Sequence, residues 1–183
     1  MCCIIYIPEN VSSPSEEMLH KIYEYNKDGI GVVLADNNFI RTTQFPVFID
    51  WFNKFRKNQT CIIHFRNATR GSKSYENCQP FYDKETNLWF AHNGTIYHLD
   101  AGRTENEKNS DSKILFEWLI VPLIKHCGWD NHVVWEIIEA QIEKGRGIFM
   151  KDGEVKMIAG DPSYKDWILK DGIYYSRKYE GII

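Results

Sequence analysis

The sequence has 183 residues, 43% of them hydrophobic and 14% aromatic, which is enough apolar material for one domain with a sizeable core. The formal net charge is -3 and no basic block occurs, so neither a nucleic-acid nor an anionic-membrane surface is indicated. No apolar run is long enough to cross a bilayer, and the N-terminal residues before Pro8 lack the basic start of a signal peptide. We therefore expect a single cytoplasmic domain over residues 1–183.

The cysteines indicate neither disulfides nor a metal site. Their number is 5, which is odd, and a chain of this length does not need disulfides to fold. Cys2 and Cys3 are adjacent, so on a strand they point to opposite faces, and Cys61 and His64 are separated in the same way. We expect no metal and no cofactor.

The first part of the chain predicts strands and helices in alternation. Ser15 is a suitable N-cap for a helix that continues to Tyr25, because its hydroxyl can accept a hydrogen bond from a first-turn N–H. Pro46 suits the first turn of a second helix, along which aromatic residues recur at helical spacing and form a core face. The expected strands are 2–7, 30–35, 39–43 and 60–66, with a hairpin turn at 36–38.

The second part contains polar loops, a pair of helices and terminal hairpin strands. Residues 67–82 are polar and irregular, as a mobile lid would be, and 101–109 form a second polar loop. Asn93 and Gly94 are expected to join strands 88–92 and 95–99, since Asn-Gly favours a type I′ hairpin turn. The other expected elements are helices 111–126 and 131–144 and strands 147–151, 154–159 and 172–176. This order predicts an antiparallel α+β domain with helices covering the sheet faces.

Cys2 is a candidate nucleophile. Removal of Met1 would leave a thiol and a free α-amine on one residue, and such an amine has a pKa of about 7.7–8.0. The amine can take the proton of its own side chain, so no separate histidine is needed as a base. Taken alone, however, a cysteine at this position is more often a small buried residue at the start of a strand.

Four downstream segments strengthen the interpretation of Cys2 as a nucleophile. They are His64 to Gly71 (HFRNATRG), Asn77 to Phe81 (NCQPF), Phe90 to Gly94 (FAHNG) and Ser110 to Ser112 (SDS). With Cys2 they resemble, in the same order, the glutaminase domain of class II glutamine amidotransferases, a family that includes amidophosphoribosyltransferase and asparagine synthetase. The resemblance implies the four-layer αββα sandwich of N-terminal-nucleophile hydrolases, with antiparallel sheets.

The resemblance also implies roles at the reacting amide. Cys2 would attack the side-chain amide of glutamine, and water would then cleave the thioester to release glutamate. The Asn93 side-chain amide and the Gly94 backbone N–H would form the oxyanion hole that the reaction needs. The hairpin-turn interpretation of these two residues is compatible with this role, because a tight turn presents donors at a strand end.

Two further residues would bind the amino-acid end of glutamine. Arg66 would hold its carboxylate and Asp111 its ammonium, while Thr69 would shape the substrate-binding loop. In isolation Arg66 would be interpreted as a surface salt-bridge residue, and Asp111 as a favourable acid in the first turn of a helix. His64 and His92 are interpreted as structural, hydrogen-bonded histidines.

The chain departs from the family pattern at three positions. Arg70 and Gln79 stand where the family motifs have His, and Lys113 stands where they have Glu. These departures leave open an amidase acting on another γ-glutamyl or small amide, and also a catalytically retired domain that binds a protein. No synthase domain follows Ile183. We therefore expect any synthase that accepts the ammonia to lie on a separate chain.

Overall fold

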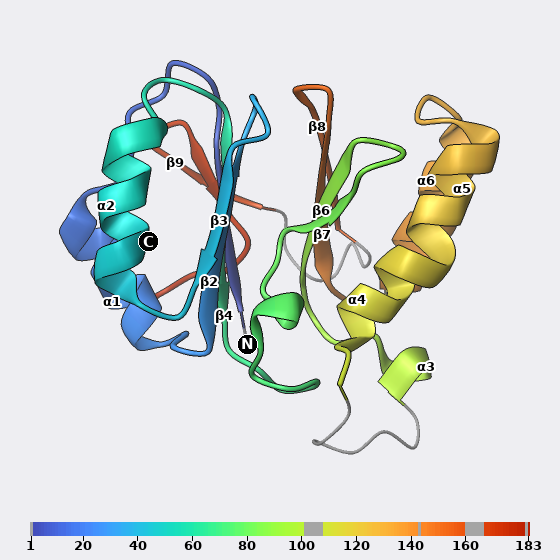
Figure 1. Ribbon diagram of the computed structural model, residues 1–183, viewed down its shortest axis with the longest axis horizontal. Helices are drawn as coiled ribbons and strands as arrows, with labels where there is room; N and C mark the ends of the chain where they lie inside the picture. The colour runs from blue at the N-terminus through green and yellow to red at the C-terminus, as the bar shows by residue number, and fades with distance from the viewer. Residues whose placement is uncertain (1, 101–107, 143, 160–166, 182) are drawn as a thin grey trace.

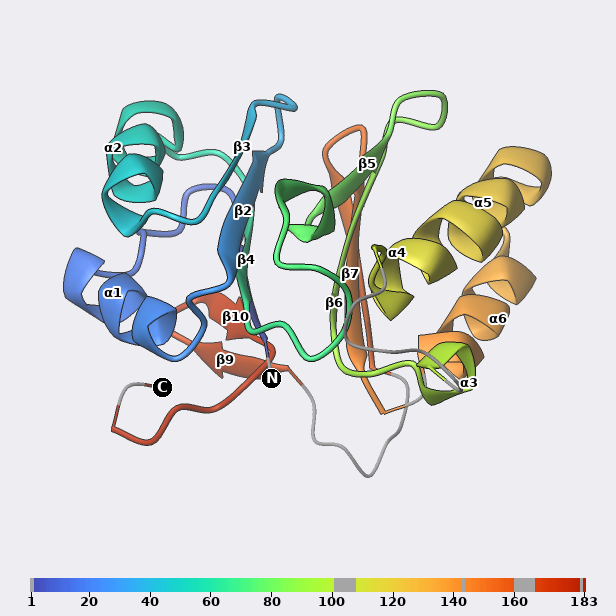
Figure 2. The same ribbon diagram turned by 60° about the horizontal axis from the view of Figure 1, so that its bottom comes forward.

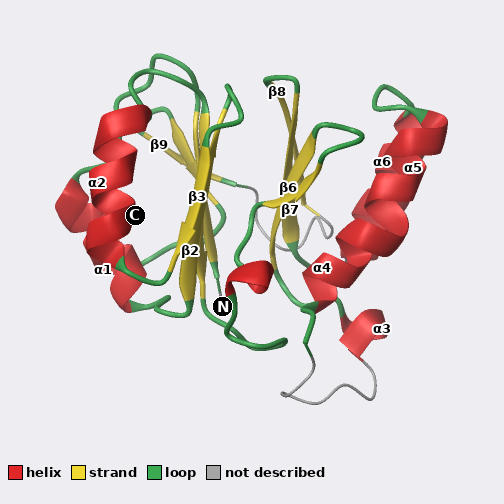
Figure 3. Ribbon diagram, viewed as in Figure 1, coloured by secondary structure: helices red, strands yellow, loops and turns green. Residues whose placement is uncertain are grey.

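The computed structural model describes residues 2–100, 108–142, 144–159, 167–181 and 183. They form four layers, in which two antiparallel β-sheets pack face to face between two helical layers (Figure 1; Figure 3). The α+β class and the αββα sandwich expected from the sequence are confirmed. Within the described part of the chain, no helix is both long and apolar enough to cross a membrane.

The first sheet has six strands and includes the N-terminal end of the chain. In the register of its central strands, Cys3 lies opposite Phe65, and Gly29 lies opposite Arg66. The start of the first strand and the end of the fourth therefore lie at the same end of the sheet. From edge to edge the strands are β3 (Phe39–Thr42), β2 (Gly29–Leu34), β4 (Cys61–Arg66), β1 (Cys3–Ile7), β10 (Ile173–Tyr175) and β9 (Ile168–Lys170).

Helices α1 (Glu16–Glu24) and α2 (Phe45–Phe55) cover the outer face of this sheet (Figure 1). Ser15 caps α1 as predicted, since its hydroxyl accepts the backbone N–H of Met18 at 3.2 Å. The apolar side of α2 is buried, and its Phe48 packs in the core between the helices and the sheet.

Alternation along the strands decides which side chains lie between the two sheets. Ile5 packs in the core beneath the helices, whereas Ile4 and Ile62 pack in the core between the sheets. The same period of two places Cys2 on the face of Ile4, and Arg66 on the face of Ile62. Both predicted site residues therefore face the second sheet.

The second sheet has four strands, in the order β5 (Phe81–Asp83), β6 (Leu88–Asn93), β7 (Arg146–Lys151) and β8 (Glu154–Ala159). Its outer face is covered by the second helical layer (Figure 1). That layer contains α4 (Asp111–Leu115), the π-helical turn η2 (Phe116–Ile120), α5 (Val121–Cys127) and α6 (His132–Ile142).

The predicted strand at 95–99 is wrong, because the chain enters α3 (Tyr97–Asp100) instead of returning beside β6. Strand β6 is already paired on both sides, with β5 and with β7, so no position is open for a hairpin partner after Asn93. The backbone N–H of Ile96 donates to the carboxylate of Asp111 at 2.8 Å, which holds the chain in its bent path.

Of the two polar segments predicted from the sequence, the structure describes the first in full and the second only in small part. Segment 67–82 contains the 3-10 turn η1 (Tyr75–Asn77) and the start of β5, a strand that was not predicted, and its role as a mobile lid stays a prediction. Most of the predicted loop at 101–109 lies outside the described residues, as does residue 143 of the predicted helix 131–144. Strand β9 is also additional to the predicted strands.

Candidate active site

A small cavity at one end of the two sheets brings the predicted site residues together. Its volume is about 20 Å³, and its lining includes Cys2, Arg66, Thr69, Gly94 and Asp111. Of the predicted site residues, only Asn93 does not line it. Figure 2 brings this end forward and shows the N-terminus beside the loop that follows β4. Segments far apart in the sequence therefore converge on one place.

Cys2 is half-buried and lies against the loop after β4. Its Sγ is 3.4 Å from the backbone N of Asn67 and 3.5 Å from the carbonyl O of the same residue. Burial raises the pKa of the Cys2 thiol, although the N–H of Asn67 and the charge of Arg66 oppose this effect. The thiol is therefore neutral near pH 7, and a base must take its proton before it can attack.

Arg66 is buried, with 3% of its surface exposed, and ends strand β4. Its Nη2 donates to the carbonyl oxygens of Arg70 at 3.1 Å and Gly71 at 3.4 Å, which folds the loop around the guanidinium. Its Nη1 is buried without a hydrogen-bond partner in the described residues. The surface salt-bridge interpretation is therefore wrong, and one side of the guanidinium is open to an acceptor.

Asp111 is the first residue of α4 and is also buried. Its Oδ2 accepts the N–H of Ile96 at 2.8 Å, and its Oδ1 accepts the N–H of Ser112 at 2.7 Å. Ser110 caps the helix by accepting the N–H of Lys113 at 3.2 Å. Asp111 is thus both an acid in a first helical turn and a buried charge at the cavity.

Asn93 ends β6, and its side chain faces the first sheet rather than the cavity. Its Nδ2 donates to Ser176 Oγ at 2.9 Å and to the Ser176 carbonyl O at 3.4 Å, while its Oδ1 has no partner in the part of the chain described. The same hydroxyl of Ser176 accepts the N–H of Ile4 at 2.8 Å. Ser176 therefore joins Asn93 to the strand that begins beside Cys2, and no motif in the sequence pointed to it.

Gly94 allows the chain to pass close to its neighbours after β6. A Cβ at this position would lie 2.7 Å from Gly145 Cα and 2.8 Å from His92 Nε2, both too close for any larger residue. A glycine is required here by packing, independently of any donation from its N–H.

His92 belongs to the site, although the sequence indicated only a structural role. Its Nδ1 is 2.9 Å from Ser112 Oγ, which lies 3.3 Å from Asp111 Oδ1. Its backbone N–H donates to Gln79 Oε1 at 2.5 Å. His92, Ser112 and Gln79 all line the cavity. His64, in contrast, does not line it and is fully buried.

The three departures from the family pattern separate in space. Arg70 and Gln79 line the cavity of Cys2, so the polar groups offered to a ligand there differ from those of the motif. Lys113 lines a different pocket.

Comparison with known proteins decides the family. A family model described as glutamine amidotransferases class-II matches residues 24–164, which is more than half of the chain. The chain belongs to the class II glutamine amidotransferases. The resemblance of the sequence motifs to this family is confirmed.

The amidotransferase sequence matches proteins considerably longer than itself. Amidophosphoribosyltransferase of Methanocaldococcus jannaschii is 37% identical over 134 residues, which are 63% of this chain and 28% of that protein. Amidophosphoribosyltransferase of Staphylococcus aureus is 29% identical over 130 residues, and the match covers 24% of that protein. The chain thus spans less than a third of the length of these relatives.

A solved structure supports the amidotransferase fold. The B. subtilis glutamine phosphoribosylpyrophosphate (PRPP) amidotransferase, complexed with ADP and GMP, matches 95% of this chain with a TM-score of 0.55 and 19% identity. The match covers 41% of that protein. At this identity the likeness establishes the fold alone.

Proposed function

We propose that this amidotransferase domain hydrolyses the side-chain amide of glutamine through Cys2 and releases ammonia and glutamate. The observation that carries the proposal is the convergence of Cys2, Arg66 and Asp111 on one cavity. These residues offer a nucleophile and one charge of each sign, and glutamine has an amide, a carboxylate and an ammonium to match.

In the proposed reaction Met1 is removed and the amine of Cys2 takes the proton of the thiol. The thiolate attacks the amide carbon, and the tetrahedral oxyanion accepts hydrogen bonds from the Gly94 N–H and from Asn93 Nδ2, which must exchange its long 3.4 Å contact with the Ser176 carbonyl for one with the oxyanion. The amine then gives the proton to the departing nitrogen, so ammonia leaves and a γ-glutamyl thioester remains. Water cleaves the thioester, which restores the thiol and releases glutamate.

Substrate binding requires the loop after β4 to move. A cavity of about 20 Å³ has room for about one water molecule, and glutamine is much larger. The carbonyls of Arg70 and Gly71 close the cavity by accepting from Arg66 Nη2. We expect these two bonds to break as glutamine enters, while Arg66 Nη1 takes the substrate carboxylate.

A second candidate function is hydrolysis of another γ-glutamyl or small amide. Arg70 and Gln79 favour it, because they line the cavity at positions where the family motifs have His. An arginine adds a donor-only positive group, so a substrate with an additional acceptor would fit better than glutamine. A retired domain that binds a protein is the third possibility, and it predicts no turnover of any amide.

Two broader predictions accompany the proposed function. The acceptor of the ammonia is expected on a separate chain, in the form of a synthase. The cytoplasmic location expected from the sequence also stays a prediction.

One experiment decides between these functions. The intact mass of the purified chain is measured, and the same sample is assayed for ammonia release from glutamine, γ-glutamyl amides and asparagine. Glutamine as the best substrate of a chain that begins at Cys2 supports the proposal. Preference for another amide supports the second candidate, and no turnover by a folded chain that begins at Cys2 would refute both.

A further inference from the structure

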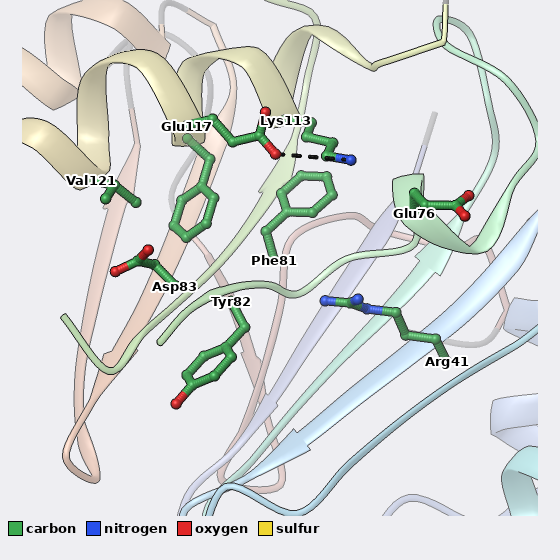
Figure 4. Close-up of a pocket in the computed structure, with 9 residues that line it drawn as sticks. Arg41, Glu76, Phe81, Tyr82, Asp83, Lys113, Glu117 and Val121 are labelled. Atoms are coloured by element: carbon green, nitrogen blue, oxygen red, sulfur yellow. Dashed lines mark ion pairs between the residues drawn. The ribbon is translucent and has the colours of Figure 1, made fainter. Parts of the chain in front are cut away.

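A second pocket lies between the facing edges of the two sheets and the helix that starts at Asp111 (Figure 4). Its volume is about 370 Å³, within the range of roughly 300–1,000 Å³ that is usual for small-molecule sites. Arg41 reaches it from β3, Phe81 from β5, and Lys113 from α4. None of its lining residues lines the cavity of Cys2, so the two sites are separate.

Arg41 is a half-buried cation without a carboxylate partner in the described residues. Its Nη2 donates to the carbonyl O of Pro80 at 2.7 Å, and its Nε is buried with no partner. Burial lowers the pKa of the Arg41 guanidinium, which is the sign of a charge whose desolvation the protein does not fully offset. An arginine in this state has donors available for an anion.

Lys113 supplies a second positive group. Its Nζ lies 3.9 Å from Glu117 Oε1, which is beyond hydrogen-bonding distance, and 18% of its side chain is exposed. Figure 4 shows the Lys113 and Arg41 side chains projecting into the pocket from different elements.

Two of the three acids that line the pocket accept hydrogen bonds from neighbouring residues. Asp83 Oδ2 accepts from the N–H of Thr86 at 2.8 Å and from its hydroxyl at 2.7 Å. The hydroxyl of Ser74 donates to Glu76 and lowers the pKa of that carboxyl. The third acid, Glu117, lies 3.9 Å from Lys113 Nζ. Each carboxylate of the pocket therefore has a protein partner, while the Nε of Arg41 has none in the described residues, which favours a ligand with an anionic group over a cation.

The base of the pocket is aromatic. Phe81 and Phe116 are buried, and their rings stack with centroids 6.0 Å apart. Phe116 begins the π-helical turn η2, and turns of this kind occur frequently at functional sites. An apolar body on the ligand would therefore contact rings rather than backbone polar groups.

We propose that this pocket binds a small organic anion, with its carboxylate or phosphate group held by Arg41 and Lys113 and its apolar body against Phe81 and Phe116. The proposal does not depend on glutamine hydrolysis, because the two sets of lining residues do not overlap.

The test uses benzoate and phenyl phosphate as probes and benzyl alcohol as the neutral control. Each is titrated into the full chain, and binding is followed by calorimetry and by amide chemical shifts. We expect saturable binding of at least one anion, shifts at residues of this pocket, and no comparable binding of the alcohol. The anion that binds more tightly identifies the head group.

Two variants and one matched control locate the binding. Arg41→Gln and Lys113→Gln should each weaken the anion at least tenfold, whereas Lys54→Gln on the exposed side of α2 makes the same charge change and should leave affinity unaltered. If the Arg41→Gln variant does not fold, the affinity of the Lys113→Gln variant for the anion tests the proposal. Protein alkylated at Cys2 should bind the anion equally well. Absence of binding by both anions, equal binding of the alcohol, or undiminished affinity in Lys113→Gln would overturn the proposal.

Discussion

Ser176 Oγ accepts hydrogen bonds from Asn93 Nδ2 at 2.9 Å and from the backbone N of Ile4 at 2.8 Å. One buried hydroxyl therefore connects the last residue of β6 to β1, and so joins the two sheets close to Cys2. The proposed oxyanion donor of the second sheet is therefore held by Ser176, the residue that directly follows β10 of the first sheet.

Ser176→Ala should damage both stability and the reaction of Cys2. The change leaves Asn93 Nδ2 and the Ile4 N–H buried with weaker partners or none, which costs about 1–3 kcal/mol for each unsatisfied group. Denaturant unfolding measures the loss, and Ser13→Ala, at an exposed position, is the matched control. If Asn93 serves the oxyanion, kcat should fall more than KM rises. Unaltered kcat in the folded variant would show that Asn93 needs no support from Ser176.

The glutamine-mimicking electrophile diazo-oxo-norleucine should modify Cys2 alone. Cys3 is fully buried, and burial raises its pKa to about 12, while Cys127 is exposed but lies far from the predicted oxyanion donors in sequence and on another element. Peptide mapping identifies the labelled residue. Iodoacetamide, which needs no binding site, should label Cys127 in the same sample. Labelling of Cys127 by diazo-oxo-norleucine, with Cys2 untouched, would exclude the proposed nucleophile.

Arg66→Ala and Asp111→Asn should each reduce kcat/KM for glutamine by roughly 30-fold or more, since loss of one partner of a buried charge pair costs about 2–5 kcal/mol. Asn keeps acceptor capacity for the N–H of Ile96, which limits the effect on folding. Asp130→Asn is the control, because 93% of that side chain is exposed. Wild-type kinetics in both site variants would favour hydrolysis of a different amide.

His64 should make the fold sensitive to acid. Burial lowers the pKa of His64 to about 3, helped by the charge of Arg66, whereas the unfolded residue titrates near 6.5. Between these pH values the unfolded state binds more protons, so stability is complete above about pH 6.5 and falls as pH drops toward 3. Unfolding midpoints measured from pH 7 to pH 4 should decline less in His64→Gln than in His126→Gln, an exposed control. If the unfolding midpoints of both variants decline in parallel, the sensitivity to acid does not come from His64.

Local signals in the sequence predicted an antiparallel α+β domain with helices on the sheet faces, and the resemblance of its motifs to the family implied the four layers and most of the residues at the cavity. Nearly continuous apolar runs marked β1 and β4, and the resemblance of the downstream motifs to the family indicated Cys2, Arg66 and Asp111 before any contact between them was known. The prediction of a hairpin at Asn93 was wrong for a non-local reason. Turn propensity cannot reveal that β6 is already paired on both sides, with β5 and with β7.

What the sequence could not predict depends on residues distant along the chain. Ser176 meets Asn93 across 83 positions, and no motif surrounds it. Arg41 and Lys113 share a pocket although one lies in an edge strand and the other lies in a helix of the opposite layer. Short strands such as β5 and β9 were missed because three residues carry too little periodicity.

Activity should depend on removal of Met1, which lies outside the described residues. While Met1 is attached, the nitrogen of Cys2 is an amide and cannot accept a proton near neutral pH. Burial already raises the pKa of the Cys2 thiol, so a chain without this base has almost no thiolate. Loss of a general base alone costs about 10²–10⁴-fold in rate.

The test compares two preparations of the same chain, with and without methionine aminopeptidase treatment, each confirmed by intact mass. The chain that begins at Cys2 should hydrolyse glutamine at a rate that rises with pH through the range of the free amine, about 7.7–8.0. The chain that retains Met1 should be nearly inactive at every pH. Equal rates would mean that another group takes the proton, and His92 would be the first to replace, because it lines the cavity and contacts Ser112 at 2.9 Å. Inactivity of both folded forms would instead favour a domain that binds a protein partner.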